Sequence, residues 1–443
     1  MKLPMPAPKY EDLLGKIARE DPQHLNKILL AQVGDDPYLH WDSLRYKSPP
    51  EGLTLEDWWL ALKLRRTRQG RTVELFQKDG RRFWFSMTDR LLRMSEDIAR
   101  RAGANFASND QVLKGQTRES YIVRSLVEEA VTSSQLEGAS TSRRDAVEML
   151  ESGRDPRDKS EMMIVNNYLA MQGIKDAPGE SLTPALVLEL HRILTDGTLD
   201  DPGEAGRLET PDHERVAVWD NEVCVHQPPR AEELPERLQQ LCDFANGGAS
   251  DGAYMPPVVR AVILHFMTGY DHYFVDGNGR TARVLFYWSM LRGQYWLSEY
   301  VTISRILRNA PSRYGATYLY TEDDDGDLTY FIHYQLETFL RALDDLEKYI
   351  SAKSQEAAAV RAALAGAGNE LGFRQVDMLE KFSRGELESI TAQAFAHRYR
   401  VTDQTARNDL DALVARGYLT KVRLGKAFIW KPTESLAKKL VNG

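Results

Sequence analysis

The stretch "HYFVDGNGRTAR", His272–Arg283, places a base, an acid, two glycines and two permanent cations within twelve residues. Largely apolar residues precede it at 258–270 and resume at Val284. This pattern predicts a helix, a tight loop at Asp276–Gly279, and a second helix. A glycine-rich loop that leads into a helix N-terminus presents several backbone N–H groups to one point, where the helix dipole adds positive potential. The loop is therefore predicted to bind an anion, and successive amides can cradle a phosphate.

The side chains of this stretch suit a nucleotide. Arg280 and Arg283 are three residues apart and share one face of the second helix, where two guanidinium groups match the outer phosphates. Asp276 is a hard oxygen ligand of the kind that Mg²⁺ uses when it bridges phosphate oxygens. His272 stands at the start of the loop, and an imidazole with an ordinary pKa of about 6.5 accepts a proton from a hydroxyl at neutral pH. Each residue alone is more often structural, but their joint arrangement favours the functional interpretation.

The stretch resembles the signature of the Fic family, H-x-F-x-[D/E]-G-N-G-R-x-x-R, at every defining position. Tyr273 departs from the family pattern, which usually has proline at this position. The departure concerns the rigidity of the loop and not its chemistry. The resemblance extends over about 160–345 and includes "PGEAGR" (202–207) and "DGDLTYFIHYQLETFL" (325–340). It implies a mainly α, helical Fic fold with a β-hairpin flap.

Fic proteins mostly transfer AMP from ATP to a hydroxyl side chain of another protein, so the resemblance implies a protein adenylyltransferase. In that family pattern His272 would be the general base, Phe274 would anchor the loop in the core, and Asp276 would bind Mg²⁺. The flap would be "RVAVWDNEVCVH" (215–226), a candidate hairpin with its turn at Asp220-Asn221. An exposed hairpin edge can hold a target peptide through backbone hydrogen bonds without reading much of its sequence.

The same resemblance assigns the phosphate-binding residues. Gly277, Asn278 and Gly279 would form the anion hole, with Asn278 at the α-phosphate. Arg280 and Arg283 would hold the β- and γ-phosphates. The kinase-like relatives called Doc carry lysine at the position of Gly279, which disfavours phosphoryl transfer here.

The stretch "SSQLEG" (133–138) ends a helix predicted to begin near Glu119 and fits the pattern [S/T]-x-x-x-E-[G/N]. Ser133 and Glu137 are four residues apart and share a helix face, and Gly138 is typical of a helix terminator. The pattern alone is weak, but upstream of a Fic signature it resembles the inhibitory helix of the family. There the glutamate pairs with the second arginine, here Arg283, and forces ATP into an unreactive pose. Whether the chain also removes AMP stays open.

Residues 371–443 contain 13 Lys/Arg against 8 Asp/Glu, whereas the whole chain has a net charge of −8. This contrast predicts a separate module. The segment 390–419 is predicted to form a helix, a turn and a second helix. Thr391 and Thr402 are suited to cap the two helices, and Gly417 to end the second. Two strands are predicted to follow, with a turn at Gly425-Lys426. That order resembles a winged helix-turn-helix, a small α+β domain.

The second helix of this module has an apolar and a polar face. Ala406, Leu410 and Leu413 are predicted to face the core. The outward residues, with side chains suited to base edges and phosphates, are Gln404, Thr405, Arg407 and Asn408. Both DNA binding and protein contact stay open for this module.

The chain as a whole has 443 residues, long enough for two or three domains. Its acidic balance excludes a general nucleic-acid coat or a membrane-surface protein, and its two cysteines are too few for a disulfide framework. It shows neither a signal peptide nor an apolar run of about 18 residues, so we expect a cytoplasmic protein without a membrane partner.

The predicted organisation has four parts. They are an N-terminal extension at 1–110 with a hairpin at 72–85, the inhibitory helix and catalytic domain at 111–350, a helical linker at 351–370, and the C-terminal module at 371–443. The acidic stretch "EDDDGD" (322–327) is expected to be a solvated loop.

The leading interpretation is an autoinhibited protein adenylyltransferase that uses ATP and Mg²⁺ to modify a Ser, Thr or Tyr hydroxyl of a target protein. A nucleotide-sensing transcriptional regulator with a Fic core is an alternative, although a pure sensor needs no base such as His272. Transfer of another nucleotide, such as UMP, is a third, because no predicted phosphate-binding residue reads the base. A homodimer also stays open.

Overall fold

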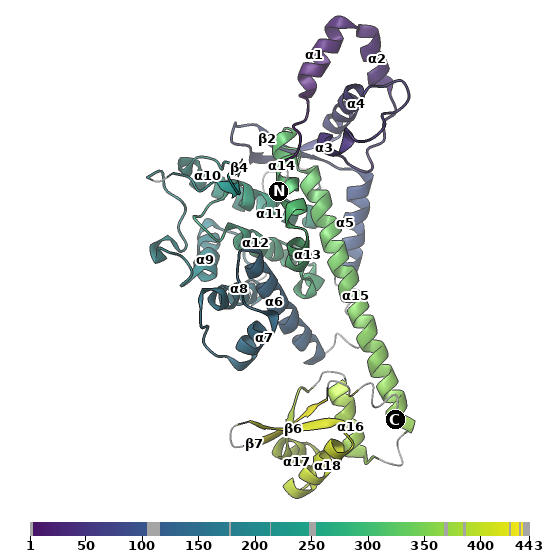
Figure 1. Cartoon of the computed structure of the whole chain (residues 1–443), viewed down its shortest axis with the longest axis vertical. Coiled ribbons are helices and arrows are strands. Elements are labelled where there is room, and N and C mark those ends of the chain that lie inside the picture. The colour runs from purple at the N-terminus through teal and green to yellow at the C-terminus, as the bar shows by residue number, and fades with distance from the viewer. Residues whose placement is uncertain are drawn as a thin grey trace. The chain divides into compact units, whose positions relative to one another are not determined.

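The computed structural model describes residues 3–103, 116–176, 179–212, 214–247, 254–366, 371–383, 387–424, 427–433 and 436. The chain is mainly helical, which confirms the predicted fold class (Figure 1). It divides into two compact units, one of Met1–Ala104 with Ser125–Leu343 and one of Asn105–Arg124 with Asp344–Gly443. The domain bounds drawn from the sequence stay a prediction.

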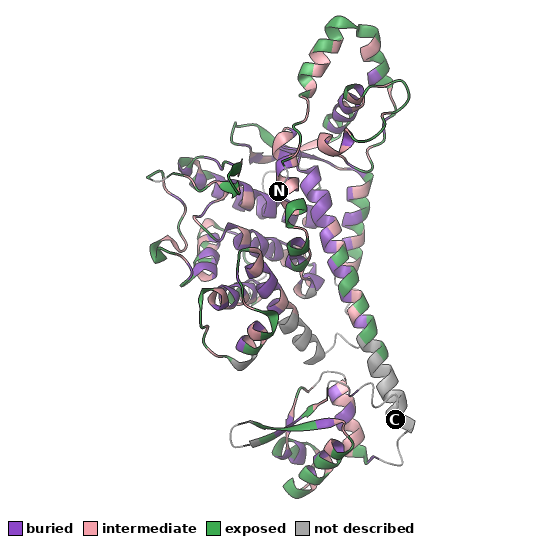
Figure 2. Cartoon of the chain, in the orientation of Figure 1, coloured by how far each residue is buried: buried purple, intermediate pink, exposed green. Residues whose placement is uncertain are grey.

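The centre of the first unit is a pair of packed helices, α11 (Pro257–Asp271) and α12 (Asn278–Arg292). Nearly all of their side chains are buried, as their colour in Figure 2 shows. Helices that lack a continuous polar face belong in the middle of a domain. Around them pack α8 (Lys159–Asp176), α9 (Pro184–Thr195) and α10 (Leu234–Ala245).

Further helices surround this centre or extend from it. They are α6 (Gln116–Leu136), α7 (Arg143–Ser152), α13 (Ile303–Asn309), α14 (Pro311–Asp323) and α15 (Thr329–Gly366), with 3₁₀ turns at Pro202–Glu204, Ala231–Glu233 and Trp296–Tyr300. The predicted linker at 351–370 continues α15 without a break as far as Gly366, and residues 367–370 lie outside the described residues.

The flap hairpin consists of β3 (Val218–Asp220) and β4 (Val223–His226), which pair antiparallel. Asp220 pairs with Val223, so the turn is formed by Asn221 and Glu222, one residue later than predicted. Asn221 has a φ of 55°, a left-handed conformation that asparagine tolerates better than most residues. Trp219 is 61% exposed, so the hairpin presents an aromatic side chain to solvent.

The described residues of the N-terminal part, 3–103, form five helices and a hairpin. The helices are α1 (Tyr10–Glu20), α2 (Pro22–Leu30), α3 (Trp41–Leu44), α4 (Leu55–Arg68) and α5 (Asp89–Ala102), and the hairpin is β1 (Gly70–Phe76) with β2 (Arg82–Ser86). The hairpin predicted at 72–85 is confirmed, and the Thr88 side chain caps α5 by accepting from the Leu91 amide. Within this part, α1 buries no residue and α4 buries much of its length (Figure 2).

The acidic stretch at 322–327 is not a solvated loop, and that prediction is wrong. Asp324 and Asp327 are buried. Asp324 lies 2.7 Å from the buried Lys63 ammonium, and Asp327 accepts a hydrogen bond from the hydroxyl of Tyr38. Their partners come from the N-terminal part, more than 250 residues earlier in the chain, so no pattern within the stretch reveals them.

The described part of the second unit that follows α15 contains the predicted helix-turn-helix, α17 (Ala392–Tyr399) and α18 (Asp403–Ala415), capped by Thr391 and Thr402. The predicted strands are β6 (Leu419–Leu424) and β7 (Ala427–Pro432), and the turn at Gly425-Lys426 lies outside the described residues. Two further elements, α16 (Phe373–Ser383) and β5 (Ile390–Thr391), were not predicted. The strands form an antiparallel sheet in the order β5-β7-β6.

Candidate active site

The loop between α11 and α12 has a left-handed residue at each end. His272 follows α11 with φ 49° and ψ 60°, and Gly277 precedes α12 with φ 82°. A Cβ atom on Gly277 would lie 2.8 Å from a methyl carbon of Thr195, so both the backbone conformation and the space require glycine. This explains physically why the loop needs a glycine at this position.

Phe274 anchors the loop, as the resemblance implied. Its ring is fully buried and stacks on the His191 ring of α9, with 3.6 Å between centroids and 4° between planes. The Gly206 amide donates to His191 Nδ1 at 3.0 Å, so His191 Nε2 carries the proton and donates to the Asp276 carbonyl at 2.9 Å. Burial lowers the pKa of His191 to about 4 and keeps it neutral. Sequence reasoning missed His191, although "PGEAGR" contains its partner.

Asn278 fastens the same loop from the other side. Its Oδ1 accepts from the Phe274 amide at 3.0 Å, and its Nδ2 donates to the Phe274 carbonyl at 2.6 Å. The same Nδ2 lies 3.2 Å from His272 Nδ1 and 3.3 Å from Nε2. Asn278 thus braces the loop and faces the histidine, while its contact with an α-phosphate stays a prediction.

His272 is half-buried. Burial lowers its pKa to about 4, and the neighbouring His226 and Arg215 act in the same direction. The imidazole is therefore neutral at pH 7, which is the form that accepts a proton. Tyr273, the departure from the family pattern, is buried and donates to Asp271 Oδ2 at 2.7 Å, so it fixes the loop rather than loosening it.

Arg280 is fully buried without being fully paired. Its Nη1 donates to the Leu194 carbonyl at 2.8 Å, but Nε and Nη2 have no hydrogen-bond partner among the described residues. Asp276 Oδ2 lies 3.7 Å from Nη2. Burial lowers the pKa of this guanidinium, since the charge is costly to hold there without an anion. The arrangement fits a phosphate group that would complete these bonds.

Asp276 is suitably placed for a metal ion that arrives with a nucleotide. Its side chain is 52% exposed, beside Arg280. Among the described residues no cluster of three or more His, Cys, Asp or Glu side chains is placed to hold a metal. Mg²⁺ is commonly bound by one or two carboxylates together with substrate phosphates, so a single carboxylate fits this role.

Arg283 is buried and held by α6. Its Nε donates to Ser133 Oγ at 2.8 Å, and its Nη2 donates to the Ser133 carbonyl at 3.0 Å and to Glu137 Oε1 at 2.7 Å. Ser133 and Glu137 of the motif at 133–138 therefore both accept hydrogen bonds from Arg283. Gly138, the third residue of the motif, follows Glu137 just beyond the end of the helix, with a φ of 92°.

Gly279 makes room for the Glu137 carboxylate. A Cβ atom on Gly279 would lie 2.2 Å from Glu137 Oε1, closer than any side chain tolerates. A lysine at this position, as in the Doc relatives, is incompatible with Glu137 where it stands here. The position of the Glu137 carboxylate seen here therefore requires a residue without a Cβ atom at 279.

Sequence reasoning missed a second carboxylate on the same helix face. Glu129 lies eight residues before Glu137, and its buried side chain accepts hydrogen bonds from the amide and hydroxyl of Ser304. Burial raises its pKa, and hydrogen bonds from Ser304 and the charge of Arg283 oppose that rise. The spacing of Glu129, Ser133 and Glu137 by four residues was the available signal.

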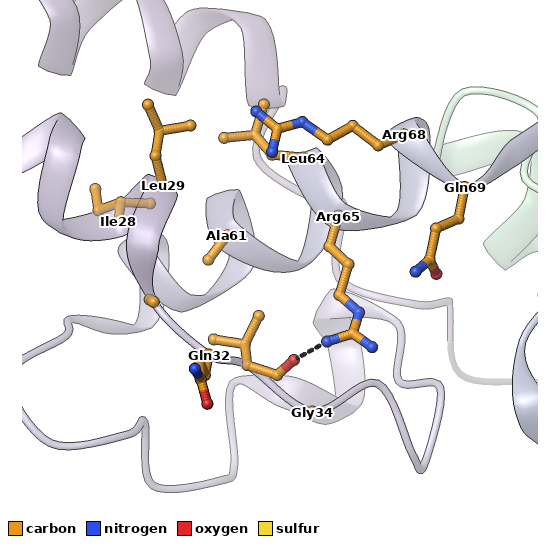
Figure 3. Close-up of a pocket in the computed structure, with 11 residues that line it drawn as sticks. Ile28, Leu29, Gln32, Gly34, Ala61, Leu64, Arg65, Arg68 and Gln69 are labelled. Atoms are coloured by element: carbon orange, nitrogen blue, oxygen red, sulfur yellow. Dashed lines mark hydrogen bonds between the residues drawn. The ribbon is translucent and has the colours of Figure 1, made fainter.

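A cavity of about 630 Å³ lies in the N-terminal part, away from this loop. Figure 3 shows its lining from α2 and α4, with Arg65 donating to the carbonyl oxygen of Val33 at 2.8 Å. Apolar side chains such as Ile28 and Leu64 form part of its wall. None of the predicted site residues lines it, so it is not the catalytic cleft.

The predicted faces of α18 are observed in the second unit. Ala406, Leu410 and Leu413 are fully buried. The residues on the other face are exposed or half-buried, namely Gln404, Thr405, Arg407 and Asn408. Gln404 Nε2 donates to Asn408 Oδ1 at 3.0 Å, and the Thr405 hydroxyl lies 2.9 Å from that of Thr402. Contacts with DNA stay a prediction.

Residues 181–290 match the Fic/DOC family model. This segment of the chain is therefore similar to a Fic domain. The matched segment includes the loop, α9, the flap and most of α12. The motif at 133–138 lies before it.

Curated relatives match about a quarter of the chain. Protein adenylyltransferase fic-1 of Caenorhabditis elegans is 34% identical over 109 residues, which are 25% of this chain and 19% of the relative. Protein adenylyltransferase Fic of Nematostella vectensis is 34% identical over 106 residues, 24% of this chain and 22% of the relative. The match thus spans about a fifth of the length of each relative.

A solved structure extends the likeness in fold. The crystal structure of a Fic family protein from Desulfovibrio desulfuricans aligns with a TM-score of 0.51 and 18% identity, covering 79% of this chain and 98% of that chain. At this identity the likeness concerns the fold alone. In the part of the chain that the structure describes, no helix is both long and apolar enough to span a bilayer.

Proposed function

We propose that the chain is an autoinhibited protein adenylyltransferase, which transfers AMP from ATP to a Ser, Thr or Tyr hydroxyl of a target protein. The observation that carries this proposal is the neutral His272 beside a loop that leads to the incompletely paired, buried Arg280. A base next to an anion site suits the attack of a hydroxyl on a phosphate. The matching relatives, named as protein adenylyltransferases, support the same reaction.

The proposed reaction needs little covalent chemistry from the protein. His272 takes the proton of the target hydroxyl, and the oxygen forms a bond to the α-phosphorus as the bond to pyrophosphate breaks. Arg280, and Arg283 once it is free, neutralise the charge of the departing phosphates, while the loop amides hold the α-phosphate. His272 then releases its proton to solvent. Mg²⁺, held by Asp276 and phosphate oxygens, would add further charge neutralisation when bound.

Glu137 would inhibit this reaction by occupying Arg283. The pair withdraws a guanidinium from the outer phosphates and puts a negative charge in their place. Such a charge-assisted hydrogen bond contributes about 1.5–3 kcal/mol. That free energy corresponds to roughly ten- to a hundredfold in the active population. The Glu137 side chain is 27% exposed, so solvent or a partner can reach it.

The flap would hold the target in extended form. Both of its short strands have exposed residues, and Trp219 and Val223 offer apolar contact beside a strand edge that pairs with no third strand in the described part of the chain. Backbone pairing of this kind tolerates many sequences, which suits an enzyme that modifies an exposed loop of another protein.

A second proposal concerns the C-terminal module, which we infer to contact DNA through α18. The observation that favours it is the exposed polar face with Gln404, Arg407 and Asn408 on a helix that follows a tight turn. A gel-shift titration at several salt concentrations tests it. Affinity should fall steeply with salt. Absence of a shift at low salt would favour a protein-contact role.

ATP labelled in either the α- or the γ-phosphate separates the possible reactions. The Glu137→Gly variant, incubated with Mg²⁺, should attach label to protein from α-labelled ATP and none from γ-labelled ATP. Label from the γ-position would mean phosphoryl transfer, and binding without any covalent label would mean a nucleotide sensor. A parallel incubation with α-labelled UTP tests whether the base matters.

A further inference from the structure

The C-terminal end of α11 presents three successive carbonyls, those of Tyr270, Asp271 and His272, and each accepts a hydrogen bond from the flap region. The donors are Arg215 and His226, which are the first and last residues of the flap stretch at 215–226. We call these two residues the flap clasp. Sequence reasoning read the middle of this stretch as a hairpin and missed the function of its ends.

Arg215 holds two of the carbonyls. Its Nη2 donates to the carbonyl oxygens of Asp271 at 2.8 Å and His272 at 2.9 Å. Its Nε donates to the Pro229 carbonyl at 2.8 Å, just beyond the other end of the hairpin. Glu209 pairs with its Nη1 and also accepts from the Val216 amide at 3.1 Å. The guanidinium is therefore fixed in orientation and joins both ends of the flap to the catalytic loop.

His226 holds the third carbonyl. Its Nε2 lies 2.7 Å from the Tyr270 carbonyl oxygen, and its Nδ1 lies 2.9 Å from Glu322 Oε2. The ring therefore bridges the Tyr270 carbonyl at the end of α11 and the Glu322 carboxylate. Glu322 belongs to the acidic stretch at 322–327. That stretch thus anchors the flap as well as the N-terminal part.

The clasp lies where the backbone most needs support. The last carbonyls of a helix have no partner within the helix, and cations stabilise its C-terminal end. His272, next to them, is a non-glycine residue in the left-handed region with φ 49°. Such a conformation costs free energy and persists only where the surroundings hold it in place.

We propose that Arg215 and His226 are positioning residues, which hold the backbone of His272 and thereby couple the orientation of the catalytic imidazole to the flap. This inference rests on the proposed adenylyl transfer. A target peptide that pairs with the flap would stiffen the hairpin whose two ends carry the clasp. Target binding to the flap would then influence the orientation of the His272 imidazole.

The electrostatics agree with this geometry. After burial, which is the largest cause, His226 and Arg215 are the groups that lower the pKa of His272, while Asp276 raises it. The clasp therefore contributes to keeping the imidazole neutral as well as oriented. Removing either side chain should raise the pKa of His272 and move the acid side of the pH profile upward.

The test uses the full chain with Glu137→Gly as the parent, so that basal labelling is measurable. Arg215→Ala and His226→Gln are added separately. Arg100→Ala is the matched control, because Arg100 is 74% exposed and its Nη2 pairs with Asp97 of its own helix. Initial rates of self-labelling from α-labelled ATP and the ATP dissociation constant are recorded for each protein.

Each clasp variant should lose about ten- to a hundredfold in labelling rate, since a misplaced base costs rates of this order. The ATP dissociation constant should stay within about threefold, because neither residue touches the phosphate-binding groups. Millimolar guanidinium should restore part of the activity of Arg215→Ala and leave the Arg100→Ala rate unchanged. Unchanged rates in both clasp variants, or a loss explained by ATP affinity alone, would overturn the proposal.

Amide hydrogen exchange provides a readout that needs no activity. His226→Gln should raise exchange both in the flap and in peptides covering 270–280, whereas Arg100→Ala should raise neither. Faster exchange confined to the flap would contradict the coupling. If the parent itself attaches no label, the proposed transfer has failed, while the exchange experiment still decides whether the clasp exists.

Discussion

The loop at 272–283 and the acidic stretch at 322–327 are both short and rich in charge, yet their buried charges differ in one respect. In the acidic stretch, Asp324 has both the Lys63 ammonium and the Tyr330 hydroxyl at 2.7 Å. In the loop, Arg280 leaves two of its N–H-bearing nitrogens without a hydrogen-bond partner among the described residues. The nearest difference is in the counter-charge: the Asp324 carboxylate lies 2.7 Å from the Lys63 ammonium, whereas the Asp276 carboxylate lies 3.7 Å from Arg280 Nη2. A buried cation without a close counter-charge is costly, so it marks a place where an anionic ligand completes the structure. A buried cation with a close counter-charge belongs to the frame that holds the site.

The largest effect is expected in the loop, from His272→Ala. The variant should lose about a hundred- to ten-thousandfold in AMP transfer, the range that a general base contributes. ATP should still bind, because His272 lies outside the phosphate-binding groups. Labelling rates and nucleotide affinity, measured separately in the Glu137→Gly background, check this. Undiminished labelling would show that His272 is not the general base. The loop would then not differ in function from the acidic stretch.

Substitutions in the acidic stretch at 322–327 should instead lower the free energy of unfolding. Asp324→Asn removes the carboxylate that pairs with the buried Lys63 ammonium at 2.7 Å, and breaking a buried pair in this way costs about 3–5 kcal/mol. Asp325→Asn is the matched control, because Asp325 is next in the chain and pairs with the exposed Arg81. Its loss should cost about 1 kcal/mol or less. Urea unfolding of the three proteins gives both values, and equal losses would contradict a specific role for the Asp324–Lys63 pair.

The contrast also explains what the sequence could predict. The roles within 272–283 follow from neighbours along the chain, so spacing alone brought the base, the glycines and the arginines together. Asp324 pairs with Lys63, and Phe274 stacks on His191, and in both cases the partner comes from a distant segment of the chain. No alternation or helical period signals such pairs, and the acidic stretch was therefore misread. The fold class followed from the resemblance of 272–283 to the Fic signature, while contacts between distant segments did not follow from any pattern.

A pH profile measures how strongly the loop environment acts on its base. The pKa of His272 is lowered to about 4, so the neutral form dominates throughout the range from pH 5.5 to 7.5. Single-turnover transfer should therefore change little over this range, and decline only as the pH approaches about 4. An ordinary histidine with a pKa of about 6.5 would lose roughly tenfold by pH 5.5. A tenfold loss would show that burial does not depress this pKa.

The smallest effect is expected from deleting 371–443. The segment has its own hydrophobic core, which includes Leu410 and Trp430, and the residues assigned to transfer all lie elsewhere. Self-labelling of the shortened chain should stay within about twofold of the full chain, once circular dichroism shows that it is folded. Loss of ATP binding in a folded protein would mean that the boundary near 371 is wrong.

The central claim is that Glu137 restrains transfer through Arg283, and four proteins test it most directly: wild type, Glu137→Gly, Arg283→Ala and the double variant. Each is incubated with Mg²⁺ and α-labelled ATP over a range of ATP concentrations. Glu137→Gly should label about ten- to a hundredfold faster than wild type. Arg283→Ala should stay slow because it loses a phosphate ligand, and the double variant should match it. If Glu137→Gly is no faster than wild type at any ATP concentration, the pair between Glu137 and Arg283 is not a brake.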